Sequence, residues 1–408
     1  MEEIPMFFNE CEALQPELVK IRRDLHQIPE IGYHLPQTQA YVLAELDKIG
    51  VPYVTSKTDS SIIATIEGGK PGKTIALRCD MDALPIVEAT GLEFASTNGN
   101  MHACGHDTHA TMLLGAAKVL FANKEKLNGT VRLLFQTAEE LARGSEVMIR
   151  DGAMIGVDQV YGMHIGTILS ADPDKYPAGT IIATPGCCMA SYDKFIIKVK
   201  GVGCHGSTPE KGVDPVNIAA HIVLGLEAIN AREFNACVPV VITVGSIHGG
   251  SQYNIIPNEV QIEGTTRCTD PDVRQKMAER IGQISEATAA AFGGSVEYTM
   301  EWGAPPVIND VDTTALAVAA AQAVVGVENV VTAVDAPNMG GEDFANYQQG
   351  LNEAGFEKKT PGTFMFLSSA NKEKGTCVAH HNPKFDVDED VLWKGSAVYV
   401  AIAEKALG

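Results

Sequence analysis

Basic residues are scarce in this chain of 408 residues. Lysine and arginine number 31 against 51 aspartates and glutamates, so the formal net charge is −20. A nucleic acid or an anionic membrane surface would require a basic patch that neutralises its phosphates. The charge balance therefore argues against both kinds of partner, and the acidity is most simply interpreted as an aid to solubility.

Targeting and membrane-spanning segments are also lacking. The first ten residues, MEEIPMFFNE, are acidic and contain no basic region followed by an apolar one, so we expect no signal peptide. No uncharged apolar run reaches the roughly 18 residues of a spanning helix. The nine cysteines are odd in number and scattered along the chain, which is typical of thiols in a reducing compartment. We therefore expect a cytoplasmic protein.

Hydrophobic periodicity in the first part of the chain predicts an α/β domain. Residues 16–50 have helical spacing on either side of a proline-containing turn, and strand-like runs then alternate with a helix. Such alternation is typical of a mixed, mostly parallel sheet flanked by helices. The predicted strands are 61–66, 74–79, 131–136 and 158–165, and the predicted helix is 107–122.

The pattern changes after residue 188. Strand-like runs at 192–200, 238–247, 259–268 and 295–301 are combined with helices at 214–230 and 271–291. Their order is βαββαβ, the ferredoxin-like arrangement. From about residue 303 the α/β pattern resumes, with helix 311–325, strands 330–334 and 363–367, and helix 388–406. We therefore predict one domain built from residues 1–188 and 303–408, and an inserted ferredoxin-like domain of residues 189–302.

The densest group of chemically active residues lies in the segment MHACGHDTH, residues 101–109. Gly105 indicates a turn just before a helix that starts near Asp107. Cys104 and His106 flank this turn, and thiolate and imidazole are the usual ligands of zinc-like ions. The alternative is a set of capping and core residues around a helix start. The other two histidines, His102 and His109, fit either a structural role or contacts to metal ligands.

Carboxylates follow two of the predicted strands. Glu139 and Glu140 come directly after VRLLFQ, at the end of a strand where α/β sheets bind ligands. Neighbours on an extended segment point to opposite sides, so one could hold a metal while the other faces a substrate. Asp80 and Asp82 follow strand 74–79 and should share a face. The alternatives are a solvated acidic loop and carboxylates that cap a turn.

Three further histidines end or follow apolar runs. His164 closes VYGMHI, and His380 and His381 precede an Asn-Pro pair. A single histidine is more often structural than a ligand. Together with the residues above, however, these histidines complete a possible ligand set of one cysteine, one glutamate and three histidines.

These segments resemble a known family. RCDMDALP, MHACGHDTHA, QTAEE, GMHI, GCHGSTPEKGVDP, YNIIPNEVQIEGTTR, MGGEDFA and HHNPKFDVDED occur in this order. They look like the peptidase M20 superfamily, and most like its amidohydrolase branch (subfamily D) of aminoacylase, hippurate-hydrolase and auxin-conjugate amidohydrolase-like enzymes. The match runs from about Arg22 to the C-terminus, and HACGHD followed by AEE is its most specific part.

The resemblance implies a function and a site. It implies metal-dependent hydrolysis of N-acyl amino acids, with two divalent ions, Mn²⁺ or Zn²⁺ and alternatively Co²⁺ or Ni²⁺. Residues 1–188 and 303–408 would bind the metals, and the inserted domain would be a lid that forms a homodimer. The implied metal ligands are Cys104, His106, Glu140, His164 and His381.

The remaining roles follow from the same resemblance. Glu139 would be the general base, and in the mechanism that we infer from these roles Asp82 would orient a ligand. His205 resembles a residue that reaches the active site of a partner subunit, the alternative being a turn histidine of its own subunit. Asn254 and Arg267 match substrate-contacting positions.

The sequence departs from the wider superfamily at three points. Asp80 stands where a histidine ligand is usual, which puts Asp80 in doubt as a ligand. QTAEE replaces QPAEE, and His380 makes the choice of the last ligand ambiguous. Two other functions remain open: a dinuclear exopeptidase acting on dipeptides, and an inactive metal-dependent binding protein of the same fold.

Overall fold

The structure, a computed structural model, describes residues 5–351 and 358–408. These residues form two compact units. The first contains Met1–Cys188, Ile308–Ala336 and Asp343–Gly408, and the second contains Met189–Val307 and Pro337–Glu342. No helix in the described ranges combines the length and apolarity needed to cross a membrane.

The first unit is built on an eight-stranded sheet of order β1-β2-β4-β3-β5-β16-β6-β15. Its central strands β4, β3, β5 and β16 are parallel, whereas β1 with β2, β2 with β4 and β16 with β6 are antiparallel. The strands are β1 (Tyr53–Thr55), β2 (Ile62–Glu67), β3 (Lys70–Asp80), β4 (Asn128–Gln136), β5 (Gln159–Gly166), β6 (Ile181–Ile182), β15 (Val330–Val331) and β16 (Gly362–Ser368).

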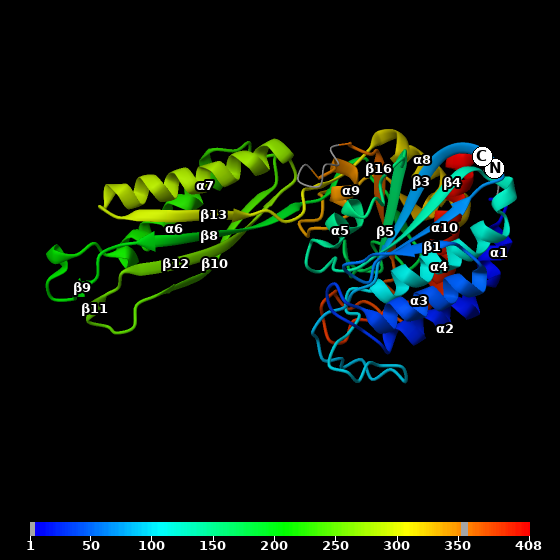
Figure 1. The fold of residues 1–408 in the computed structure, drawn as a ribbon, viewed down its shortest axis with the longest axis horizontal. Coiled ribbons are helices and arrows are strands. Elements are labelled where there is room, and N and C mark those ends of the chain that lie inside the picture. The colour runs from blue at the N-terminus through cyan, green and yellow to red at the C-terminus, as the bar shows by residue number, and fades with distance from the viewer. Residues whose placement is uncertain (1–4, 352–357) are drawn as a thin grey trace. The chain divides into compact units, whose positions relative to one another are not determined.

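Helices flank this sheet, as Figure 1 shows. The helix α4 (His106–Ala122) is buried over most of its length and packs with α10 (Leu392–Leu407) against β3. The prediction of a mixed, mainly parallel sheet with flanking helices is confirmed. The other helices of this unit are α1 (Phe8–Ala13), α2 (Gln15–His26), α3 (Pro36–Ile49), α5 (Gly144–Arg150), α8 (Val311–Val325) and α9 (Ala345–Gln349).

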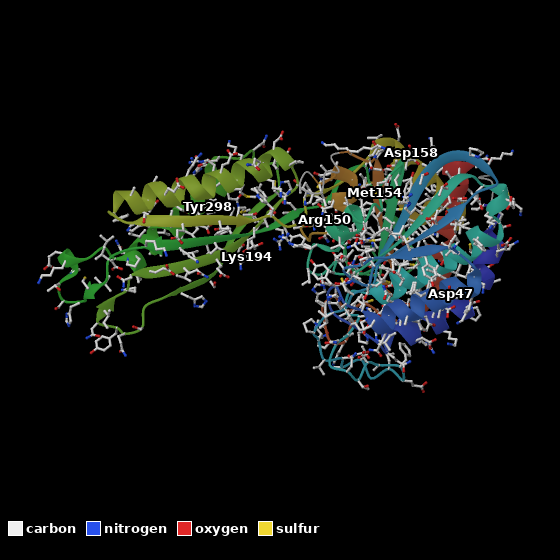
Figure 2. The ribbon with its side chains drawn as sticks, in the orientation of Figure 1. Asp47, Arg150, Met154, Asp158, Lys194 and Tyr298 are labelled. Carbon is white, nitrogen blue, oxygen red and sulfur yellow. The ribbon has the colours of Figure 1, made fainter. Side chains whose placement is uncertain are left out.

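The second unit contains a four-stranded antiparallel sheet of order β10-β12-β8-β13. Its strands are β8 (Ser191–Lys200), β10 (Val240–Gly249), β12 (Glu259–Cys268) and β13 (Ser295–Glu301). The helices α6 (Pro215–Arg232) and α7 (Pro271–Ala291) pack against each other and against this sheet. Tyr298 of β13 donates its hydroxyl to the carbonyl oxygen of Ala278 at 2.8 Å, which fastens α7 to the sheet (Figure 2).

Short elements complete the fold. A two-stranded sheet in the second unit joins β9 (Cys204–His205) to β11 (Ile255–Ile256). Another two-stranded sheet joins β7 (Gly186–Met189) to β14 (Val307–Asn309). The periodic sequence pattern does not reveal these pieces, because a strand of two to four residues is too short to display a period.

Candidate metal centre

The parallel strands bring three of the predicted segments to one edge of the sheet. Asp80 ends β3, Gln136 ends β4 just before the two glutamates, and His164 lies near the end of β5. Since these strands are parallel neighbours, their carboxyl ends meet where α/β sheets bind ligands.

The turn before α4 places Cys104 and His106 at the same edge. Gly105 has a φ of 85°, in the left-handed region that favours glycine. A Cβ atom added to Gly105 would lie 2.9 Å from Cγ2 of Ile165 on β5. Glycine is therefore needed at position 105 for two reasons, the backbone conformation and the close approach of β5.

Four groups of side chains that contain Cys104 or His106 each bring their metal-ligating atoms within 4.8 Å of one another. The sulfur of Cys104 lies 3.4 Å from Nε2 of His164. Nε2 of His106 lies 4.0 Å from a carboxylate oxygen of Glu139 and 4.0 Å from Oε1 of Glu140. The groups are Cys104–His106–His164, Cys104–Glu140–His381, His106–Glu139–Glu140 and Asp80–His106–His109.

Glu140 joins two of these groups. Its Oε1 lies 3.4 Å from Nε2 of His381, on a loop that arrives from the far end of the sequence. The five residues implied as metal ligands are thus brought together by the structure. His380 is not part of the groups: its Nε2 accepts a hydrogen bond from the backbone N–H of Thr167 at 3.0 Å, and its ring packs on Phe385.

The segment bearing the two glutamates is a turn. Ala138 has a φ of 52°, and the chain reverses directly after β4. The prediction that Glu139 and Glu140 point to opposite sides of an extended segment is therefore wrong. Both carboxylates face His106, because the left-handed residue rotates the backbone between the strand and the glutamates.

Asp82 holds this turn in place. Its two carboxylate oxygens accept hydrogen bonds from the backbone N–H groups of Glu139 at 3.0 Å and Glu140 at 3.1 Å. Oδ1 of Asp82 also lies 3.5 Å from Nδ1 of His106. One buried carboxylate therefore contacts the three residues that we expect to share the metals and the proton, in agreement with an orienting role.

Both carboxylate oxygens of Asp80 already have partners within the protein. Arg78 donates to it at 2.7 Å, and Nδ1 of His109 lies 2.5 Å from its other oxygen. Nε2 of His109 accepts the backbone N–H of Ile165 at 2.8 Å, so both ring nitrogens of His109 are used. The Asp80–His106–His109 group is consequently a poor metal site, which agrees with the doubt about Asp80.

The electrostatics of the centre favour added positive charge. Burial acts to lower the pKa of His106, but the surrounding carboxylates of Asp80, Asp82 and Glu140 raise it to about 10. Burial and the nearby glutamates hold the pKa of the Cys104 thiol well above its usual value. Burial, with His109 beside it, lowers the pKa of His164. The buried carboxylates around His106 thus make this a negatively charged site, which bound cations would neutralise.

The residues present fit two divalent ions. Among the described residues, His106 Nε2 and Glu140 Oε1 are buried without a hydrogen-bond partner. Nδ1 of His164 lies 2.7 Å from the carbonyl oxygen of Ile165, to which it donates, so Nε2 carries the lone pair toward Cys104. Imidazole, thiolate and carboxylate are ligands suited to zinc and similar metals.

Three predicted site residues lie in the second unit. His205 is in β9, where Gly206 donates its N–H to the carbonyl oxygen of Asn254 at 2.8 Å. Arg267 is on β12, donates to the carbonyl oxygen of Thr266 at 2.9 Å, and has its guanidinium 5.3 Å from the ring centroid of Tyr192. His205 and Asn254 are neighbours, whereas Arg267 is on a different sheet.

Sequence reasoning missed the buried residues that support the strand ends. Asp343 accepts hydrogen bonds from Arg78 at 2.9 Å, from Gln136 at 2.8 Å and from the N–H of Ser145 at 3.0 Å. The signal was present, because all but Ser145 lie in the motif segments RCDMDALP, QTAEE and MGGEDFA. No spacing rule could have joined residues 265 positions apart.

Comparison with known proteins shows the family of the chain. The family model described as Peptidase family M20/M25/M40 matches residues 76–405. The chain belongs to this family. It is 37% identical to thermostable carboxypeptidase 1 of Saccharolobus solfataricus over 99% of both chains. It is 38% identical to N-acetyl-L-cysteine deacetylase of Bacillus subtilis, over 97% of this chain and 89% of that protein.

A solved structure extends the comparison to the fold. The YxeP protein of Bacillus subtilis, described as a dinuclear metal-binding peptidase of the M20 family, has a TM-score of 0.80 at 32% identity. The match covers 97% of this chain and 99% of that one. The M20 chain described here is therefore a metal-dependent amidohydrolase, and the predictions of family and enzyme class are confirmed.

Replacement of Cys104 tests its place in the centre. We expect Cys104→Ser to weaken metal binding by at least about tenfold, because a hydroxyl is a poorer ligand than a thiolate. Thiol reagents should also inactivate the metal-free protein faster than the metal-loaded one. Cys237→Ser is the matched control, since Cys237 is exposed in the second unit. Wild-type metal content and activity in Cys104→Ser would remove Cys104 from the site.

Proposed function

We propose that this M20 enzyme hydrolyses the amide bond of N-acyl amino acids, with acetyl, benzoyl or similar acyl groups, and releases a carboxylic acid and a free amino acid. The observation that carries the proposal is Glu139, a buried carboxylate turned toward the His106–Glu140 group. The turn that contains Glu139 and Glu140 thus supplies a base and a metal ligand side by side. The similarity to N-acetyl-L-cysteine deacetylase of Bacillus subtilis supports the same reaction class.

Cys104, His106, Glu140, His164 and His381 would hold two divalent ions, Mn²⁺ or Zn²⁺ first and Co²⁺ or Ni²⁺ as alternatives. When bound, such ions polarise the amide carbonyl and lower the pKa of bound water. The dinuclear metal-binding relative of known structure supports this number of ions.

The side chains of the protein have the remaining roles in the reaction. Glu139 takes a proton from the attacking water and returns it to the leaving nitrogen. Asp82 holds the backbone of Glu139 and Glu140, so the base keeps its position relative to the ligands. His205 donates a hydrogen bond to the oxyanion of the tetrahedral species. Arg267 and Asn254 bind the amino-acid portion of the substrate.

We propose that His205 acts across a homodimer formed through the second unit. The strand β10 is an edge of its sheet, and its side chains are exposed toward its C-terminal end. A bare edge can pair with the same edge of a second copy, which gives a two-fold symmetric dimer. We further propose that the enzyme is cytoplasmic, because its nine cysteines are odd in number and scattered along the chain, as is typical of a reducing compartment.

Substitution of Arg267 tests recognition of the free carboxylate. We expect Arg267→Ala to raise KM by about 10- to 100-fold for substrates with a free carboxylate, as the loss of a charged hydrogen bond implies. The matching amide or ester should change little. Arg232→Ala is the control, because Arg232 is an exposed residue of α6 in the same unit. Equal effects on acid and amide substrates would identify Arg267 as a structural strand residue.

A substrate panel tests the function itself. The names of the carboxypeptidase relatives favour a second candidate, an exopeptidase acting on dipeptides. We therefore propose to measure turnover of N-acetyl and N-benzoyl amino acids and of dipeptides, with protein reconstituted in single metals. Preference for the acylated substrates supports our proposal, and preference for dipeptides contradicts it. Turnover of neither would favour a binding protein.

A further inference from the structure

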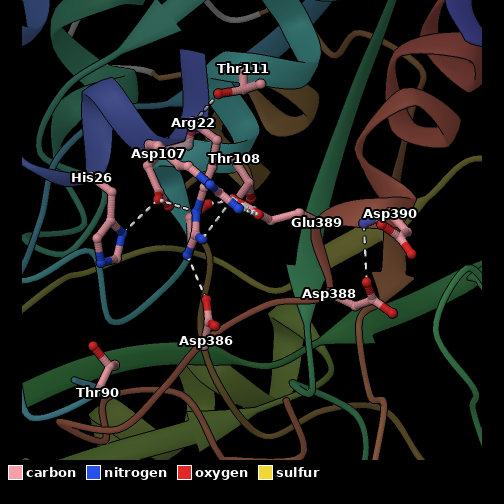
Figure 3. A network of polar contacts seen from close by, with 12 residues as sticks. Arg22, His26, Thr90, Asp107, Thr108, Thr111, Asp386, Asp388, Glu389 and Asp390 are labelled. Carbon is pink, nitrogen blue, oxygen red and sulfur yellow. Dashed lines mark hydrogen bonds and ion pairs between the residues drawn. The ribbon is translucent and has the colours of Figure 1, made fainter. Parts of the chain in front are cut away.

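A second buried polar cluster lies beside the metal centre, around Arg22 of α2 (Figure 3). The Arg22 side chain is only 2% exposed, yet its guanidinium contacts three carboxylates. Nε donates to Asp107 at 3.0 Å, Nη2 to Asp386 at 2.7 Å and Nη1 to Glu389 at 3.1 Å. The mechanism proposed above uses none of these residues.

The partners of Arg22 belong to the two segments that carry the proposed ligands. Asp107 directly follows His106 in the first turn of α4. Asp386 lies five positions after His381. One planar cation thus connects the turn of Cys104 and His106 to the loop of His381.

The loop of His381 depends on outside contacts for its position. His381 has a φ of 60° and a side chain that is 53% exposed, so packing of its own ring fixes it weakly. Phe385 of this loop is buried, and His380 accepts the N–H of Thr167 at 3.0 Å. The N–H of His381 donates to Ala103 at 2.9 Å, the carbonyl oxygen of Pro383 accepts from Ala89 at 2.7 Å, and Asp386 binds Arg22.

A third segment, the loop that contains Glu88 and Phe94, also packs near the guanidinium of Arg22. His26 lies between Asp107 and Glu88, with Nδ1 2.8 Å from Asp107 and Nε2 3.1 Å from Glu88. Glu88 belongs to the loop between Asp82 and Cys104, whose ends meet in a bridge between Leu84 and Met101. The ring of Phe94 in this loop covers the guanidinium at 4.9 Å.

Stability alone is a poor explanation for this cluster. Removing charges from water costs free energy that offsets much of their attraction, so a buried ion pair often stabilises a fold no more than apolar residues would. The specific property of arginine is its rigid planar fork, which can hold several carboxylates at set angles. Lysine cannot replace it, because an ammonium is a single point of charge.

We propose that Arg22 is a positioning residue for the metal centre, which sets the spacing between the turn of Cys104 and His106 and the loop of His381. This inference rests on the ligand set of the proposed function. We expect the loss of the Arg22 contacts to weaken the binding of one ion more than that of the other. Of the proposed ligands, His381 lies on this loop, whereas His106 begins α4, His164 lies on β5, and Cys104 belongs to a group with either set.

Metal titration of the full chain tests the inference without reference to activity. Metal-free wild type, Arg22→Lys and Asp386→Asn would be titrated with Co²⁺ by calorimetry and by absorption of the metal–thiolate band. We expect two ions per wild-type chain. In both variants one ion should bind as in wild type and the other about 10- to 100-fold more weakly, the range found when residues behind metal ligands are changed.

Arg23→Met is the matched control. Arg23 neighbours Arg22 on α2 and also binds Glu389, at 2.6 Å, but its side chain is 46% exposed and its hydrogen bonds run to Glu389 alone among these acids. It should bind both ions as wild type does. Asp386→Asn changes one atom of a partly exposed side chain, so it still tests the contact if Arg22→Lys fails to fold. Circular dichroism of the metal-free proteins checks the fold of each variant.

Three results would overturn the inference. Both variants could bind both ions normally, both ions could weaken equally, or Arg23→Met could lose one ion as Arg22→Lys does. Fewer than two ions in wild type would instead contradict the proposed metal centre, and the inference with it.

Discussion

Glu139→Gln is expected to reduce turnover by about 10²- to 10⁴-fold, the usual contribution of a general base, while metal content stays near that of wild type. The amide keeps the shape of the side chain but accepts no proton from water. The backbone N–H of Glu139, which binds Asp82 at 3.0 Å, is unaffected by the change, so the turn should keep its conformation.

Glu140→Gln is the matched comparison, one residue along the same turn. Its Oε1 lies 3.4 Å from Nε2 of His381 and 4.0 Å from Nε2 of His106, so Glu140 would hold metal together with these histidines. An amide is a weaker ligand than a carboxylate, so this variant should lose metal as well as activity. Metal analysis and steady-state kinetics on both variants check the pair. The reverse pattern would mean that the base and the ligand are exchanged.

The sequence predicts the longer elements because their signals are local. The helices α6 and α7 begin after Asp214 and Asp270, each followed by proline, and both aspartates accept backbone N–H groups of the first turn. The main strands of both sheets are found from their apolar runs. The predicted end helix 388–406 instead begins at Leu392, because residues Glu389–Val391 form a 3-10 turn.

The candidate site is predictable in its residues but less so in its geometry. Parallel strands bring Asp80, Gln136 and His164 to one edge, and this follows from the alternation of strands and helices. The direction of Glu139 does not follow, because Ala138 adopts a left-handed conformation without being a glycine. The contact of Arg22 with Asp386 joins residues 364 positions apart, beyond any periodicity in the chain.

The conformation of His205 is suited to donating a hydrogen bond. Nδ1 accepts the backbone N–H of Ser207 at 3.2 Å and lies 2.7 Å from the hydroxyl of the same residue. Nε2 is therefore the ring nitrogen that can donate, and because the residue is exposed it can donate to a second molecule. A donor aimed at an oxyanion contributes about 10²- to 10³-fold to kcat, so His205→Ala should lose that much.

Mixing two inactive variants tests whether His205 acts across a dimer. His205→Ala and Glu139→Ala would be combined under conditions that exchange subunits. One site of each mixed dimer has its own Glu139 and receives His205 from the other chain, so about one quarter of wild-type activity should return at equal amounts. The control mixture is Glu139→Ala with Glu140→Gln. Both changes lie in the metal-binding unit, so no site of a mixed dimer is whole. If subunits demonstrably exchange and the first mixture stays as inactive as the control, His205 serves its own subunit or none, and the dimer has no part in the reaction.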